Sequence, residues 1–166
     1  TNTNSVNGAT NVKASDVSDY GDGRDLQVSF TRAQNESNVT NYRVFAVKTK
    51  DAANFNLAAA KSVASQNYTT VSKTSTTNTT LSTTLSSSAR DTSGELIRSG
   101  VAYTVFVQSV SSNESVLASN LSSGSSSITL STGNSTVPFI TQVTDIGDAG
   151  DGRDLRVSFN KVSNES

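Results

Sequence analysis

A twelve-residue phrase occurs twice in this chain of 166 residues, once near each end. DYGDGRDLQVSF begins at Asp19 and DAGDGRDLRVSF begins at Asp148, an offset of 129 residues with two positions changed. The segments that follow, TRAQNES after Phe30 and NKVSNES after Phe159, also correspond. A chain with this internal repeat is expected to fold as tandem copies of one unit, and the second copy here is only a beginning.

The repeat sets the expected domain organisation. We expect a linker or the end of a preceding repeat at residues 1–8, a complete repeat at residues 9–133, and the first two strands of a second repeat at residues 134–166. Two strands alone bury almost nothing and are marginal in water. The chain is therefore expected to be a slice of a longer tandem array, or else its last segment pairs with a neighbouring molecule.

Short segments of alternating apolar and polar residues recur through the first copy, which is the pattern of half-buried β-strands. In DLQVSF, for example, Leu26, Val28 and Phe30 fall on one face and the polar residues on the other. Further strands are expected within Asn11–Ser15, NYRVFAVKT (41–49), NTTLSTTLSS (78–87), GVAYTVFVQSV (100–110), SSITLST (126–132) and PFITQVTD (138–145). Such a series with turn residues between the strands predicts an all-β antiparallel sandwich.

One segment, NFNLAAAKSVAS, has helical spacing instead. Asn56 is a suitable N-cap, and Phe55 is expected to pack back against Ala60. Leu57, Ala60 and Ala64 are expected to face the sheet. We therefore expect one short helix inserted after the strand at residues 41–49.

Four aromatic residues have two open interpretations. Tyr20, Tyr68, Phe45 and Phe106 could form an exposed platform that binds sugars, or they could pack beneath a helix or loop. Phe45 and Phe106 fall on the faces of their strands opposite to Tyr42 and Tyr103. The inserted helix is expected to cover them, which favours the second interpretation.

The strand segments resemble those of the fibronectin type III domain. DLQVSF, VTNYRVFAVK and SGVAYTVFVQSVSS are similar to its strands B, C and F, with Phe30 in place of the usual tryptophan. Tyr103 stands where that family has a tyrosine at the start of strand F. The whole pattern resembles the fibronectin-like repeats of surface-layer and cell-wall proteins of Gram-positive bacteria. The inserted helix and a length of about 125 residues depart from the ordinary module.

Aspartates are concentrated just before the second expected strand of each copy. The first copy has Asp16, Asp19, Asp22 and Asp25, and the second has Asp145, Asp148, Asp151 and Asp154. Ca²⁺ takes six to eight oxygen ligands and mixes carboxylates with backbone carbonyls. Gly21 and Gly23 allow the backbone to turn its carbonyl oxygens inward. The phrase therefore predicts half of a calcium site.

The resemblance to fibronectin type III domains implies where the remaining calcium ligands come from. It implies that the loop before strand B and the loop before strand F share the end that meets the next domain. The second loop reads RDTSGE and contains Asp91 and Glu95. The ordinary alternative stays open, because Asp and Gly are also the favoured residues of tight turns. The spacing does not match an EF-hand loop.

Several functions are excluded or disfavoured by composition. The chain has no His and no Cys, so the usual general base, zinc ligands and thiolate chemistry are absent. Its formal net charge of −1 disfavours nucleic acid as a partner. No apolar run approaches the roughly 20 residues that span a bilayer, and no motif positions a nucleophile. We expect a protein that is not an enzyme and does not insert into a membrane.

The expected function is that of a structural repeat in an exported bacterial protein of the surface layer or cell wall, where it spaces domains or builds a lattice. The expected location is extracellular. Its expected partners are neighbouring repeats or copies of the same protein, and cell-wall polysaccharide is a further candidate. Two alternatives stay open: a non-catalytic spacer or carbohydrate-binding module of a secreted polysaccharide-degrading enzyme, and a repeat of an adhesin.

Overall fold

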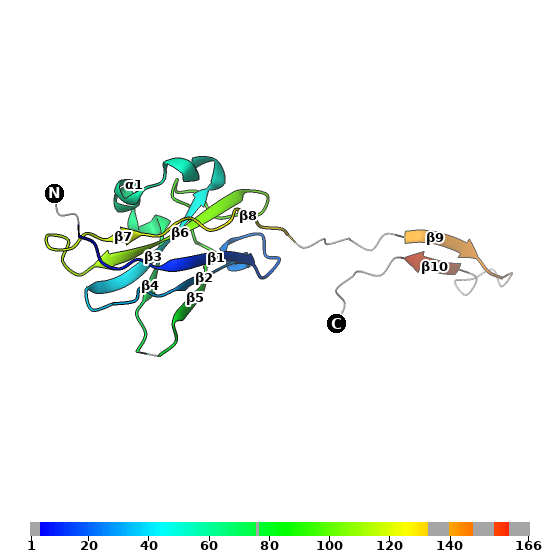
Figure 1. The fold of residues 1–166 in the computed structure, drawn as a ribbon. Coiled ribbons are helices and arrows are strands. Elements are labelled where there is room, and N and C mark those ends of the chain that lie inside the picture. Colours follow the sequence, from blue (N-terminus) through cyan, green and yellow to red (C-terminus); the bar gives the residue numbers. More distant parts are fainter. Residues whose placement is uncertain (1–3, 76, 133–139, 148–154, 160–166) are drawn as a thin grey trace. The chain divides into compact units, whose positions relative to one another are not determined.

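A computed structural model describes residues 4–75, 77–132, 140–147 and 155–159. The contacts divide the chain into two units, Thr1–Thr132 and Gly133–Ser166, which we call unit 1 and unit 2. Unit 1 contains most of the secondary structure (Figure 1).

Unit 1 is built mainly from antiparallel β-strands in two sheets. The first sheet has the order β1–β2–β5, with β1 at Thr10–Asp16, β2 at Leu26–Thr31 and β5 at Thr80–Thr84. The second has the order β4–β3–β6–β7, with β4 at Thr69–Ser72, β3 at Val39–Lys48, β6 at Ala102–Ser111 and β7 at Asn120–Leu121. β8 (Ile128–Thr129) also pairs with β6. The prediction of an all-β antiparallel fold is confirmed.

The main core of unit 1 lies between the inner faces of the two sheets. Three strands contribute most of it: Leu26, Val28 and Phe30 from β2, Tyr42, Val44 and Ala46 from β3, and Tyr103, Val105 and Val107 from β6. Each of these side chains is at most 2% exposed. Burial of a large apolar side chain stabilises the folded state by about 1.5–3 kcal/mol, so this interior accounts for the packing of the two sheets against each other. The predicted alternation is confirmed in β2, whereas parts of β3 and β6 are buried on both faces.

A short helix, α1 (Leu57–Ser62), follows β3, as predicted. It is accompanied by 3₁₀ helices at Thr49–Asn54 and Ser65–Asn67. Asn56 caps α1, and its side chain accepts a hydrogen bond of 2.9 Å from the Ala59 N–H. Ala60 is fully buried and Leu57 is partly buried, whereas Ala64 is exposed. The prediction for Ala64 is wrong because α1 ends at Ser62 and the next residue is already extended.

The helical segment covers the outer face of β3 and β6 (Figure 1). Phe45 is 0% exposed and Phe106 is 8% exposed, and both pack in a second cluster with Ala60. The Phe55 ring lies 5.5 Å from that of Phe45 and 5.1 Å from that of Phe106. The structure therefore confirms that the helical segment covers Phe45 and Phe106, and these two side chains are not an exposed surface for sugars.

The segment before β1 belongs to unit 1. Val6 is 4% exposed and lies in the main core. Its N–H donates to the Ala118 carbonyl at 2.9 Å, and the Ala118 N–H donates to the Asn4 carbonyl at 3.0 Å. Residues 1–8 were expected to be a linker or the end of a preceding repeat, and those described, from Asn4 onward, lie in unit 1, where they pair with the segment that precedes β7.

Unit 2 contains one antiparallel hairpin in the described residues, formed by β9 (Ile140–Asp145) and β10 (Leu155–Phe159). Its register repeats that of β1 with β2. Asp145 pairs with Leu155 as Asp16 pairs with Leu26, and Val143 pairs with Val157 as Ala14 pairs with Val28. The register also shifts at corresponding places, before Lys13 in β1 and before Gln142 in β9. The sequence repeat is therefore also a repeat of strand pairing.

Candidate functional site

The repeated phrase forms the turn between β1 and β2. Its centre is a 3₁₀ helix at Gly23–Asp25 that is capped by Asp22, whose side chain accepts a hydrogen bond of 2.9 Å from the Arg24 N–H. Gly21 has a φ of +79°, in the left-handed region that residues other than glycine rarely adopt. The order of Gly and Asp in the phrase therefore follows from the backbone of this turn.

Asp25 is the buried anchor of the turn. Its side chain is 0% exposed, and its two carboxylate oxygens accept hydrogen bonds from the Tyr20 N–H at 2.8 Å and the Gly21 N–H at 2.5 Å. A buried carboxylate is expensive unless such donors meet it. Asp25 thus holds the turn closed, because its hydrogen bonds to the backbone replace those that it would make with water.

Arg24 covers the outer side of the turn. Its guanidinium lies 2.8 Å from a carboxylate oxygen of Asp22 and 3.9 Å above the centre of the Tyr20 ring. The hydrogen bond from the Arg24 side chain lowers the pKa of Asp22 below its ordinary value. Tyr20 itself is 62% exposed, so this outer layer of the turn faces solvent.

The turn packs against the loop that connects β5 to β6. A Cβ on Gly23 would lie 2.1 Å from the Ser86 carbonyl oxygen, so only glycine fits there. The Ser99 N–H donates to the Gly21 carbonyl at 3.3 Å, and Asp22 forms a single β-bridge with Arg98. The expectation that these two loops share one end of the unit is confirmed.

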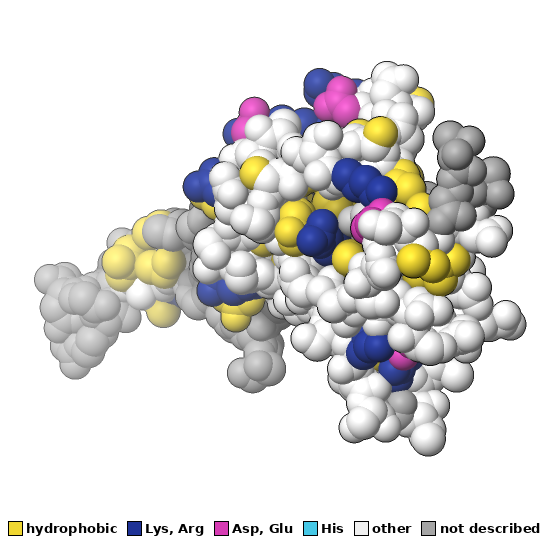
Figure 2. Space-filling view, turned by 90° about the vertical axis from the view of Figure 1, so that its left-hand side faces the viewer, with side chains coloured by type: hydrophobic (Ala, Val, Ile, Leu, Met, Phe, Trp, Pro, Cys, Tyr) yellow, Lys and Arg dark blue, Asp and Glu magenta, His cyan; other side chains and the backbone are white. Residues whose placement is uncertain are grey.

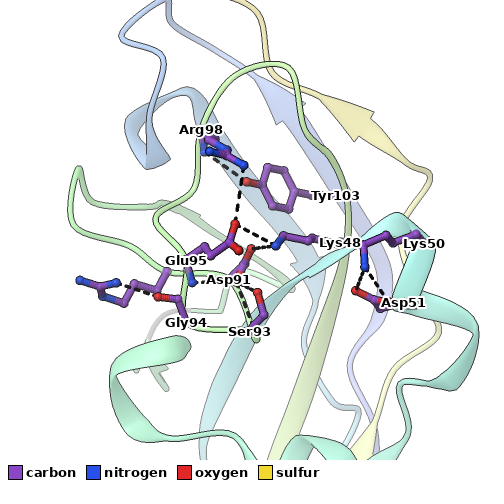
Figure 3. A network of polar contacts seen from close by, with 10 residues as sticks. Lys48, Lys50, Asp51, Asp91, Ser93, Gly94, Glu95, Arg98 and Tyr103 are labelled. Atoms are coloured by element: carbon purple, nitrogen blue, oxygen red, sulfur yellow. Dashed lines mark hydrogen bonds and ion pairs between the residues drawn. The ribbon is translucent and has the colours of Figure 1, made fainter.

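In the second loop, Asp91 has the same role that Asp25 has in the first. It is 0% exposed, and one of its oxygens accepts hydrogen bonds from the Ser93 N–H, the Ser93 hydroxyl and the Glu95 N–H at 2.6–3.1 Å. Figure 3 shows the Lys48 ammonium between the side chains of Asp91 and Glu95. Its nitrogen lies 3.6 Å from a carboxylate oxygen of Asp91 and 2.9 Å from one of Glu95. The hydrogen bond to Glu95 raises the pKa of Lys48.

Tyr103 links this loop to β6. Its hydroxyl oxygen accepts a hydrogen bond of 3.2 Å from the Arg98 N–H (Figure 3). Burial raises the pKa of Tyr103, so the phenol stays protonated at neutral pH. The sequence indicated the position of Tyr103, but it gave no signal for Lys48, which reaches Asp91 from the far end of β3.

Asp16 and Asp19, the remaining two predicted calcium ligands of the first copy, differ in their contacts. Asp16, at the end of β1, accepts hydrogen bonds from the Ser131 N–H and the Ser131 hydroxyl, both at 2.9 Å. These hydrogen bonds join the end of β1 to the segment that follows β8. Asp19 is exposed on the turn.

The predicted calcium ligands are thus only partly brought together. Within the ranges that the structure describes, no three acidic side chains group in a way that could hold a metal ion. Both oxygens of Asp25 and one oxygen of Asp91 accept hydrogen bonds from donors of the protein itself. The second oxygen of Asp91 accepts no hydrogen bond from the described residues and lies 3.6 Å from the Lys48 ammonium. Asp145 is the last residue of β9, while Asp148, Asp151 and Asp154 lie outside the described residues. Calcium binding stays an untested prediction, and the hydrogen bonds that the turn donates to Asp22 and Asp25 favour the tight-turn alternative.

Comparison with known proteins adds no identity. No protein-family model, no curated protein and no solved structure matches this chain. In the described part of the chain no helix has the length and apolar character needed to cross a membrane.

Proposed function

We propose that this chain is a structural repeat module of an exported bacterial cell-surface protein, of the surface-layer or cell-wall kind, in which fibronectin type III-like units space domains or build a lattice. Two features of unit 1 support the resemblance. β3 pairs with β6 along most of its length, as strands C and F do in that family. Tyr103 bonds back to the backbone upstream of β6, as the tyrosine corner of immunoglobulin-like sandwiches does.

The observation that carries the mechanical part of the proposal is the arrangement of the two end segments. The chain enters unit 1 beside Ala118, where Ser5 forms a parallel bridge with it. It leaves beside Asp16, which holds Ser131. The entering and leaving segments therefore run in the same direction, and Figure 1 shows the N-terminal end and the end of β8 at opposite ends of the unit. Tension along the chain would load these contacts together instead of opening them one by one.

The surface also suits a spacer. Figure 2 shows a face on which basic and acidic side chains are scattered and hydrophobic side chains form small patches, between which the surface consists of backbone and of other side chains. Such a surface keeps an array soluble without attracting nucleic acid. The proposal places the chain outside the cell, without a catalytic role, beside copies of itself or other repeats and the cell-wall polysaccharide.

Pulling single molecules of the full chain by their two ends tests this function. We expect unit 1 to unfold in one event that lengthens the chain by roughly 40 nm, from about 120 residues at 3.3–3.6 Å each. Asp16→Ala removes both bonds to Ser131 and is expected to lower the unfolding force, whereas the exposed Asp19→Ala is the matched control and should not.

Two results would count against the mechanical role. One is gradual extension of unit 1 at low force without a distinct event. The other is an equal unfolding force for Asp16→Ala and the unsubstituted chain, since the bonds at the end of β1 would then carry no load. Retention of the chain on insoluble glycans would favour the carbohydrate-binding alternative instead.

A further inference from the structure

The β9–β10 hairpin exposes an apolar face. Val143 is 56% exposed, Leu155 57% and Val157 44%. Val143 and Val157 pair directly across the hairpin, and Leu155 is two residues from Val157, so the three side chains share one face. A strand pair with three aliphatic side chains open to solvent on one face is a candidate docking surface.

The same face is fully covered in unit 1. Leu26 and Val28 are the equivalents of Leu155 and Val157, and both are 0% exposed. They lie in one core with the inner faces of β3 and β6. The two hairpins share their register and the place of the register shift, and such irregularities set the local twist of a strand pair. The two faces are therefore expected to have the same shape.

We propose that the apolar face of β9–β10 is a docking surface for a strand pair of the β3–β6 kind, supplied by the repeat that this hairpin begins. The proposal rests on the repeat nature of the chain proposed above. The expected partner pattern is Tyr-x-Val-x-Ala beside Tyr-x-Val-x-Val, as in Tyr42–Ala46 and Tyr103–Val107. This partner is supported by unit 1, where the equivalent residues Leu26 and Val28 pack against β3 and β6.

A second copy of the hairpin fits less well. β9 has six residues and β10 has five, so two such hairpins packed face to face would bury only a few side chains on each side. Stable association needs about 800 Å² from each partner. The four-strand packing seen in unit 1 supplies larger side chains, including two buried tyrosines, against the same face.

The sequence itself provides the partner for a test. Residues 160–166 correspond to residues 31–37, so residues 38–132 can be joined directly after Ser166 to complete the second repeat. The chain has no cysteine, so a single Val157→Cys substitution reports on this face through its rate of reaction with a thiol reagent. Arg156→Cys, on the other face of β10, is the matched control.

We expect the Val157→Cys thiol to react quickly in the 166-residue chain and on the order of 100-fold more slowly in the extended chain, since labelling then requires local opening. Arg156→Cys should react at similar rates in both. Equal rates for Val157→Cys in the two chains would overturn the proposal. So would slow labelling in the 166-residue chain together with a dimer in sedimentation, because a second copy would then occupy the face. Neither result alters the force response of unit 1, which tests the proposed function separately.

Discussion

Gly23→Ala is expected to lower the free energy of unfolding of unit 1 by about 3 kcal/mol, because the site has no room for a methyl group. The new Cβ would lie 2.1 Å from the Ser86 carbonyl oxygen and 3.0 Å from the Ala89 Cβ. The first neighbour is backbone and cannot rotate away, so the turn or the loop must move. Urea denaturation followed by circular dichroism measures the loss.

Gly100→Ala is the matched control for this substitution. Gly100 has a φ of +76°, but a Cβ there would meet nothing within 4 Å. Its replacement therefore introduces only the strain of a left-handed residue, about 1 kcal/mol. If the two variants lose equal stability, the close approach of the turn to Ser86 does not hold the two loops together.

Asp25→Ala is expected to cost about 3 kcal/mol, because it leaves the N–H groups of Tyr20 and Gly21 without the carboxylate oxygens that accept from them in a buried turn. Asp25→Asn should lose less, since its remaining oxygen still accepts from one of them. The same denaturation measurement applies. The exposed Asp19→Ala is the control and should leave the stability of unit 1 within about 0.5 kcal/mol of its starting value.

A loss at Asp25 no larger than that at Asp19 would contradict the assignment of Asp25 as the anchor of the turn. The comparison is informative because both residues belong to the repeated phrase and both were predicted as calcium ligands. In the structure only Asp25 is buried with protein donors around it.

The strands with clear alternation could be predicted from the sequence, because one residue in two must enter the core. β2 follows this rule, and in β3 and β6 the opposite face is buried as well, in the second cluster beneath the helical segment. β4 and β7 could not be predicted: β4 has only Val71 as an apolar residue, and β7 has two residues. They form because β3 and β6 offer edges to pair with, which is a property of the sheet and not of their own side chains.

The end of α1 was predicted too late for a related reason. The alanine-rich segment extends the helical pattern to Ala64, but the backbone becomes extended at Val63. Val63 packs at the edge of the cluster around Phe45 and Phe106, and Tyr68 does so a few residues later. The aromatic side chains of the sheet therefore decide where the chain leaves the helix, and no local propensity contains that information.

The candidate site shows a limit of a different kind. Clustered aspartates predicted either a cation site or a tight turn, and the residue types fit both. The difference lies in which donors the carboxylates meet. The donors to Asp25 are backbone N–H groups of its own turn, and Asp91 lies beside Lys48 from a strand more than 40 residues away. Neither feature is visible before the chain is folded.

Thermal unfolding of the full chain in calcium and in a chelator tests most directly the claim that the repeated aspartate phrase is a turn satisfied by the protein's own donors. We expect the same melting temperature in both conditions, because backbone N–H groups already donate to both oxygens of Asp25, the buried carboxylate of the turn. A melting temperature higher by more than about 4 °C in calcium would contradict it, since a ligand that binds the folded state stabilises that state.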